Sequence, residues 1–116
     1  MDCYLKELVE RGKVRALERH LEKSLKDVKV KFTSIASRLA SLRITDSQSR
    51  IVGDYFITDF SCNKDPEFYV LPRSRSNRVI KEEEVAKHYF DFMAIIFDDY
   101  TYAFDDYYSE NNIDNN

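Results

Sequence analysis

Two histidines and two cysteines are the side chains of this chain most suited to catalysis. His20 and His88 are far apart in the sequence, and Asp91 follows His88 by three residues. Nucleophilic catalysis requires a nucleophile within hydrogen-bond reach of a base that a third group orients. No glycine-rich turn between a strand and a helix presents such a nucleophile. We therefore expect that the histidines are not catalytic and that the protein is not an enzyme.

Ligands for metal ions and phosphate groups are equally scarce. The pairs Asp98-Asp99 and Asp105-Asp106 offer oxygen atoms, but no calcium loop of EF-hand form, with its central glycine, surrounds them. The 2 glycines are isolated from each other, which excludes the glycine-rich phosphate loops of nucleotide-binding proteins. We expect no cofactor, no metal and no small-molecule substrate.

The cysteines and the N-terminus indicate the compartment. Cys3 and Cys62 form no Cys-x-x-Cys pattern, which predicts two free thiols in a reducing environment. Nothing resembles a signal peptide, and no apolar run approaches the roughly 20 residues that span a bilayer. We expect a cytoplasmic protein without membrane contact, with a nuclear location left open. Abundant Tyr, Ile, Asp and Asn beside only 2 Gly and 2 Pro suggest an AT-rich genome and a viral accessory protein.

Charge is distributed unevenly along the 116 residues. The formal net charge is -3, but up to Arg50 twelve Lys and Arg stand against seven Asp and Glu, which leaves +5 there and -8 in the remainder. Cations on a predicted long helix and in an arginine-rich loop are suited to phosphate contacts. These candidate nucleic-acid contacts are Lys29, Lys31, Arg38, Arg43, Arg73, Arg75 and Arg78.

Three aromatic residues on predicted strands add to this hypothesis. Tyr55, Phe56 and Tyr69 are suited either to stacking on bases or to packing in the core. The pI of about 5.4 argues against a dedicated nucleic-acid binder.

The elements that must position these residues begin with a heptad pattern. Seven apolar residues follow one another at spacings of 4 and 3, which are the a and d positions of three heptads. The pattern predicts a helix over residues 13–44, on the order of 45 to 50 Å long at 1.5 Å per residue. The strict alternation over residues 28–32 favours a strand instead, but the heptads extend further and contain no breaker. The predicted interaction seam consists of Leu21, Leu25, Val28, Phe32, Ile35, Leu39 and Leu42.

The other predicted elements flank this region. Residues 2–11 read as helix, with Leu5, Leu8 and Val9 on one side and a break or kink at Gly12. Residues 46–49 are polar and end the long helix. Residues 50–62 and 67–71 read as two strands of an antiparallel hairpin, with a bulge at Gly53.

The C-terminal half continues with a short third strand at residues 79–80 and a second helix. Residues 81–84 open that helix with three acidic residues, which suit the positive end of the helix dipole, and it runs to about Asp98. Its predicted core-facing stripe is Val85, Tyr89, Phe92, Ile95 and Ile96.

These elements predict an α+β fold. Residues 1–98 form one domain with a long N-terminal amphipathic helix, a small antiparallel sheet and a second helix. Residues 99–116 form an acidic tail rich in Tyr and Asn that we expect to be at least partly disordered.

Two functions follow from the seam and the charges. The leading hypothesis is a protein-interaction or regulatory protein that self-associates, in the manner of a coiled coil, or binds a protein partner. It would use the 21–42 seam and the acidic tail with Asp98, Asp99, Asp105 and Asp106. The alternative is a small nucleic-acid-binding protein that uses the arginine loop at residues 73–78 and the helix lysines, with the acidic tail as an autoinhibitor.

Overall fold

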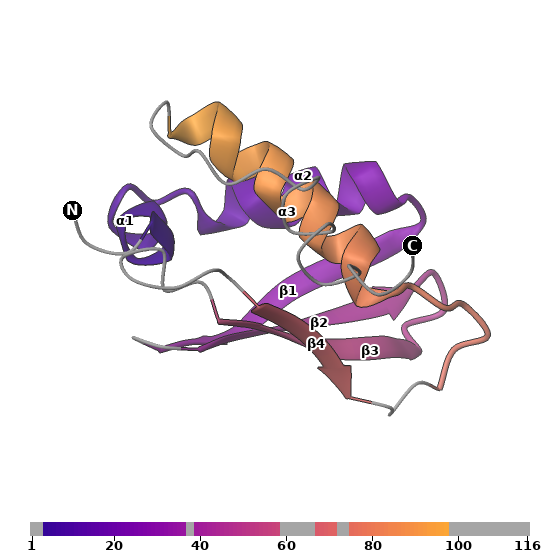
Figure 1. Cartoon of the computed structure of the whole chain (residues 1–116). Helices are drawn as coiled ribbons and strands as arrows, with labels where there is room; N and C mark the ends of the chain where they lie inside the picture. Colours follow the sequence, from indigo (N-terminus) through magenta and orange to yellow (C-terminus); the bar gives the residue numbers. More distant parts are fainter. Residues whose placement is uncertain (1–3, 37–38, 59–66, 72–74, 98–116) are drawn as a thin grey trace, which may run out of the picture.

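The computed structural model describes residues 4–36, 39–58, 67–71 and 75–97. These residues form three helices and a four-stranded antiparallel sheet (Figure 1), which confirms the α+β class. In chain order the elements are α1 (Tyr4–Glu10), α2 (Val14–Leu25), β1 (Val28–Ile35), β2 (Ala40–Asp46), β3 (Ile51–Thr58), β4 (Glu67–Leu71) and α3 (Glu82–Ile96).

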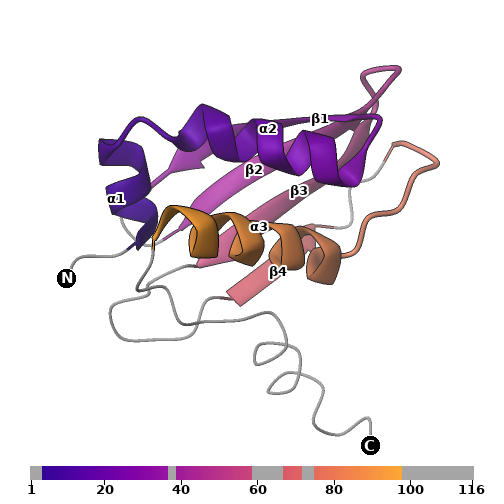
Figure 2. The same cartoon turned by 90° about the horizontal axis from the view of Figure 1, so that it is seen from above.

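The sheet is a meander in which each strand pairs with the next one in the sequence, in the order β1-β2-β3-β4. Both α2 and α3 lie across the same face of this sheet (Figures 1 and 2). Because side chains alternate between the two faces of a strand, every second residue meets the helices. Leu42, Ile44 and Ile57 are fully buried on this covered face, where they pack with Leu21 and Tyr89 of the helices.

The predicted long helix over residues 13–44 is wrong. Helix α2 ends at Leu25, and the chain turns through Lys26 and Asp27, whose φ angles are 64° and 59°. The alternative of a strand over residues 28–32 is right, because β1 begins at Val28. The apolar spacing of 4 and 3 therefore does not reflect one helix. Its first residues follow the period of helix α2, and its later residues follow the alternation of strands β1 and β2.

The predicted seam is consequently not a continuous surface. Four of its residues are buried in the core, two are half-buried, and Leu39 is 37% exposed. The buried four are Leu21, Leu25, Val28 and Leu42, and the half-buried two are Phe32 and Ile35.

The N-terminal region consists of two separate helices rather than one kinked helix. Gly12 lies between them with φ 68°, a left-handed conformation that glycine adopts without steric cost. Its N–H donates to the carbonyl of Val9, and the N–H of Lys13 donates to that of Leu8. These bonds satisfy carbonyls at the end of α1. Leu5 and Leu8 are buried as predicted, whereas Val9 is exposed.

The polar residues 46–49 form the turn between β2 and β3 instead of ending a helix. Strand β3 lies within the predicted residues 50–62, and β4 matches the predicted residues 67–71, so the antiparallel hairpin is confirmed. The register shift between β2 and β3 leaves Val52 as the extra residue, next to Gly53. The third strand expected at residues 79–80 is absent from the described part of the chain.

Helix α3 confirms the predicted second helix. Val85, Tyr89 and Phe92 of its stripe are buried, whereas Ile95 is 69% exposed and does not face the core. Residues 98–116, which include the predicted acidic tail, lie outside the described residues.

Candidate functional site

The face of the sheet opposite α2 and α3 carries no helix of the described residues (Figure 1). We call it the open face. Its composition follows from the register, because residues paired across strands lie on the same side. One row runs through Lys31, Arg43, Asp54 and Leu71, and the next runs through Ser41, Phe56 and Tyr69. Lys29 and Thr45 form a third pair.

Two aromatic rings dominate the half of the open face on β3 and β4. Phe56 and Tyr69 are register partners, and their ring centroids lie 5.2 Å apart with an interplanar angle of 12°. Tyr69 is 44% exposed, so the stacked pair of Phe56 and Tyr69 presents an accessible aromatic surface. This arrangement is suited to stacking with a further planar group.

The third aromatic candidate, Tyr55, has a structural role instead. It lies on the covered face, and its hydroxyl donates a hydrogen bond to the carbonyl of Ile80 at 2.5 Å. Burial, reinforced by the charges of Glu82 and Glu84, raises the pKa of Tyr55 to about 12. Tyr55 is therefore a neutral core residue and contacts no ligand on the open face.

The half of the open face on β1 and β2 is basic and hydroxyl-bearing. Lys29 and Lys31 are exposed and form no ion pair with a described residue. Arg43 holds both oxygens of Asp54, with Nε–Oδ1 at 2.8 Å and Nη2–Oδ2 at 3.2 Å. The hydrogen bond and the charge of Asp54 raise the pKa of Arg43 further. Lysine ammonium groups and an arginine fork are the usual protein ligands of phosphates.

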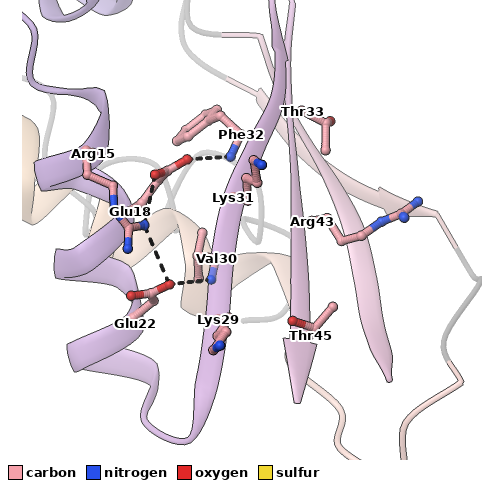
Figure 3. Close-up of a pocket in the computed structure, with 10 residues that line it drawn as sticks. All are labelled: Arg15, Glu18, Glu22, Lys29, Val30, Lys31, Phe32, Thr33, Arg43 and Thr45. Atoms are coloured by element: carbon pink, nitrogen blue, oxygen red, sulfur yellow. Dashed lines mark hydrogen bonds and ion pairs between the residues drawn. The ribbon is translucent and has the colours of Figure 1, made fainter. Parts of the chain in front are cut away.

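A groove of about 810 Å³ runs along β1, the strand at one edge of the sheet (Figure 3). It is lined by basic and hydroxyl-bearing residues of β1 and β2, by Val30 and Phe32, and by Arg15, Glu18 and Glu22 of α2. Figure 3 shows the two carboxylates pointing from α2 to the backbone of β1, whereas Arg43 and Thr45 lie beyond this strand and point away from α2.

The other predicted phosphate contacts do not join this face. The guanidinium of Arg78 donates through both Nη atoms to the carbonyls of Leu25 and Lys26, at the end of α2. Arg78 therefore caps the C-terminal carbonyls of α2, and its Nη atoms are already engaged in the fold. Arg75 is exposed, on a segment whose backbone N–H groups at residues 75 and 76 donate to Ile51. Arg38 and Arg73 lie outside the described residues.

His20 of α2 and His88 of α3 are close enough for their charges to interact. The ring of His20 lies 5.3 Å from that of Phe92, and burial followed by the charges of Lys87 and His20 lowers the pKa of His88. Within the described residues no group of three or more His, Cys, Asp or Glu is placed to hold a metal ion. The helices in the described part of the chain include none that is long and apolar enough to cross a membrane.

Sequence reasoning missed several residues of this region. The hydroxyls of Thr33, Ser41 and Thr45 join the open face only because β1 and β2 are strands, and Asp54 of β3 pairs with Arg43 for the same reason. For Glu18 and Glu22 the sequence contained one indication of a shared site. Their i,i+4 spacing on α2 places both side chains on one side of the helix.

Comparison of the chain with models of protein families, with curated proteins and with solved structures gives no significant match.

Proposed function

We propose that this chain is a non-enzymatic binding protein whose open face binds single-stranded nucleic acid. The observation that carries the proposal is the stacked, accessible pair of Phe56 and Tyr69 on the same face as Lys29 and Lys31. Nonspecific single-strand binding combines these two elements, aromatic surfaces for the bases and cations for the phosphates. The cations lie on the two strands beyond the rings, so stacking and phosphate contact fall on neighbouring halves of one face.

Local charge supports this assignment although the whole chain is acidic. Lys29, Lys31 and Arg43 stand on β1 and β2, and the carboxylate of Asp54 compensates only Arg43. The width of the sheet, about 14 Å over three interstrand spacings, suits a short run of nucleotides that crosses the strands. The proposal therefore keeps Lys29, Lys31 and Arg43 from the predicted contacts, on strands instead of a helix, and leaves out the arginine loop.

The experiment is a titration of a fluorescently labelled single-stranded oligonucleotide, of mixed sequence, with the full chain at low and moderate salt. Tyr69→Ala should weaken binding about 5- to 150-fold, the equivalent of about 1–3 kcal/mol per stacked base. Lys29→Gln with Lys31→Gln should weaken binding and flatten its dependence on salt concentration, because fewer counterions are released.

The matched control is Lys13→Gln with Lys87→Gln, which removes the same charge from exposed residues outside the open face. This control should retain the affinity of the parent apart from a small nonspecific loss. If the parent does not bind at low salt, or if both lysine pairs matter equally, the proposed site is wrong.

The acidic tail enters the proposal as a competitor for the open face. Residues 99–116 contain Asp99, Asp105, Asp106, Glu110 and Asp114 and no Lys or Arg. A segment of this composition is attracted to the same cations as a phosphate backbone. Ending the chain after Asp98 should therefore tighten oligonucleotide binding, most clearly at low salt. Unchanged or weaker binding would count against autoinhibition.

A protein partner on the open face is the second candidate. Leu71 is exposed on the same side of β4 as Tyr69, and exposed apolar and aromatic residues together are typical of protein interfaces. Leu71→Ser should then weaken capture of that partner without changing oligonucleotide affinity. This version keeps the interaction hypothesis but moves it from the buried 21–42 seam to the sheet.

A further inference from the structure

The outer edge of β1 is closed by two carboxylates of the same chain. A strand at the edge of a sheet leaves every second backbone N–H without a strand partner. On β1, the N–H of Val30 donates to Glu22 Oε2 at 2.8 Å, and that of Phe32 donates to Glu18 Oε2 at 2.7 Å (Figure 3). The carboxylate oxygens thus occupy the positions of the carbonyl oxygens of a neighbouring strand.

The match depends on two regular spacings. Residues i and i+4 of a helix are about 6 Å apart along its axis. Residues i and i+2 of a strand are about 6.7 Å apart. Because the turn at Lys26 and Asp27 reverses the chain, Glu22 meets Val30 and Glu18, one helical turn earlier, meets Phe32.

Arg15 holds the carboxylates in place. Its Nη1 lies 3.1 Å from Glu18 Oε1 and 3.9 Å from Glu22 Oε2. Glu18 is only 7% exposed, although glutamate is rarely buried, and its two oxygens are satisfied by Arg15 and by the backbone of β1. Because each carboxylate oxygen of Glu18 has its own hydrogen-bond donor, the side chain is held in one position.

We propose that Glu18 and Glu22 act as a surrogate strand that keeps the β1 edge from pairing with a second copy of this chain. Without them, an eight-residue strand would offer free donors beside an open groove, and the same edge of another copy is its complementary partner. Lys29 and Lys31 oppose this pairing as well, because two antiparallel β1 strands would bring four lysines together. The proposal does not rest on nucleic-acid binding, although Lys29 and Lys31 take part in both.

The test is the molar mass in solution, by light scattering, of full-length Glu18→Met with Glu22→Met. Methionine keeps the length and helix propensity of glutamate, but its thioether sulfur accepts a hydrogen bond from an N–H group only weakly. We expect this variant to have a larger mass than the parent at equal concentration. The increase should grow with salt, which screens the lysines, whereas an ionic association would weaken.

Two further variants separate hydrogen bonding from charge. Glu18→Gln with Glu22→Gln removes both charges but keeps a carbonyl oxygen that accepts the N–H, so it should retain the mass of the parent. Glu10→Met with Glu84→Met makes the same chemical change at exposed helical positions away from β1 and should also behave like the parent. An increase in mass in either of these variants would overturn the proposal.

Amide hydrogen exchange identifies the surface through which the protein associates. It also tests the proposal in the parent and in a single variant, in case the double variant does not fold. In the parent, the N–H groups of Val30 and Phe32 should exchange slowly despite their place on an edge strand. In monomeric Glu22→Met the N–H of Val30 should exchange quickly, whereas that of Phe32, which still donates to Glu18, should stay slow. The N–H of Val30 should be protected again when that variant associates. Fast exchange of both groups in the parent, or association that leaves Val30 unprotected, would show that the edge is not the surface involved.

Discussion

Tyr55 and Phe56 are neighbours in the sequence and lie on opposite faces of the sheet. Tyr55 is 1% exposed, packs beneath the helices and bonds to Ile80, whereas Phe56 stacks on Tyr69 on the open face. Because side chains alternate along β3, one of these two aromatic residues lies in the core and the other lies on the open face. The difference shows that the covered face carries the buried core, whereas the open face carries exposed side chains, to which we assign the proposed binding.

Exchanging the hydroxyl between the two neighbours gives the largest expected effect. Tyr55→Phe leaves the carbonyl of Ile80 without its donor in the core and should lower the free energy of unfolding by about 2 kcal/mol. Phe56→Tyr places a hydroxyl on the open face and should change it by no more than about 0.5 kcal/mol. Urea denaturation of both variants measures the contrast, and equal losses would contradict the assignment of the two faces.

Arg78 was predicted from the sequence as a nucleic-acid contact but has a structural role. Arg78→Gln removes the charged donor from the end of α2 and should cost about 1.5 kcal/mol of stability, while oligonucleotide affinity stays unchanged. Arg75→Gln, a loss of the same charge from an exposed side chain nearby, should leave stability unchanged. Thermal unfolding and an oligonucleotide titration of both variants distinguish a structural arginine from a surface contact.

The turn that directs β1 onto the sheet can be improved. Lys26 has φ 64° and ψ 139°, a conformation that strains any residue except glycine. Lys26→Gly should therefore raise the free energy of unfolding by about 1 kcal/mol. Lys23→Gly, three residues earlier inside α2, should lower it by about the same amount. A loss of stability in both variants would mean that Lys26 is not strained.

The smallest effect concerns pH and the interface between α2 and α3. Burial, with the charges of Lys87 and His20, lowers the pKa of His88, and the charges of Asp91 and Glu84 only partly oppose this. The unfolded chain therefore binds a proton at His88 more readily, so stability is lost as the pH falls through about 6.5. In His88→Gln the decrease in unfolding temperature between pH 7.5 and pH 5.5 should be smaller than in the parent.

Local sequence was sufficient for β3, β4 and α3, although not for residues 79–80, where the predicted strand is absent. The segments that form β3 and β4 are rich in β-branched and aromatic residues and are bounded by turn formers in the sequence, and α3 opens on three glutamates. In these segments composition, period and boundary residues all point to the same structure.

The region of β1 and β2 was mispredicted because two patterns coincide there. Val28, Phe32 and Leu42 satisfy both a heptad spacing and the alternation of a strand. No glycine or proline marks the turn at Lys26 and Asp27, so the sequence offers no local signal for the end of α2. The candidate site changed with this error, since Lys29, Lys31 and Arg43 were identified as cations but assigned to a helix.

By itself the sequence determined the α+β class, the β3–β4 hairpin and α3, because each depends on propensities and periods within a short segment. The tertiary structure alone decided where α2 ends and which face of the sheet stays open. Arg78 reaches the end of α2 from 53 residues away to bond the carbonyl of Leu25, and Glu18 and Glu22 hold β1 from the helix before it. Such contacts join residues that no local pattern relates, and they select one of two structures that the local sequence permits almost equally.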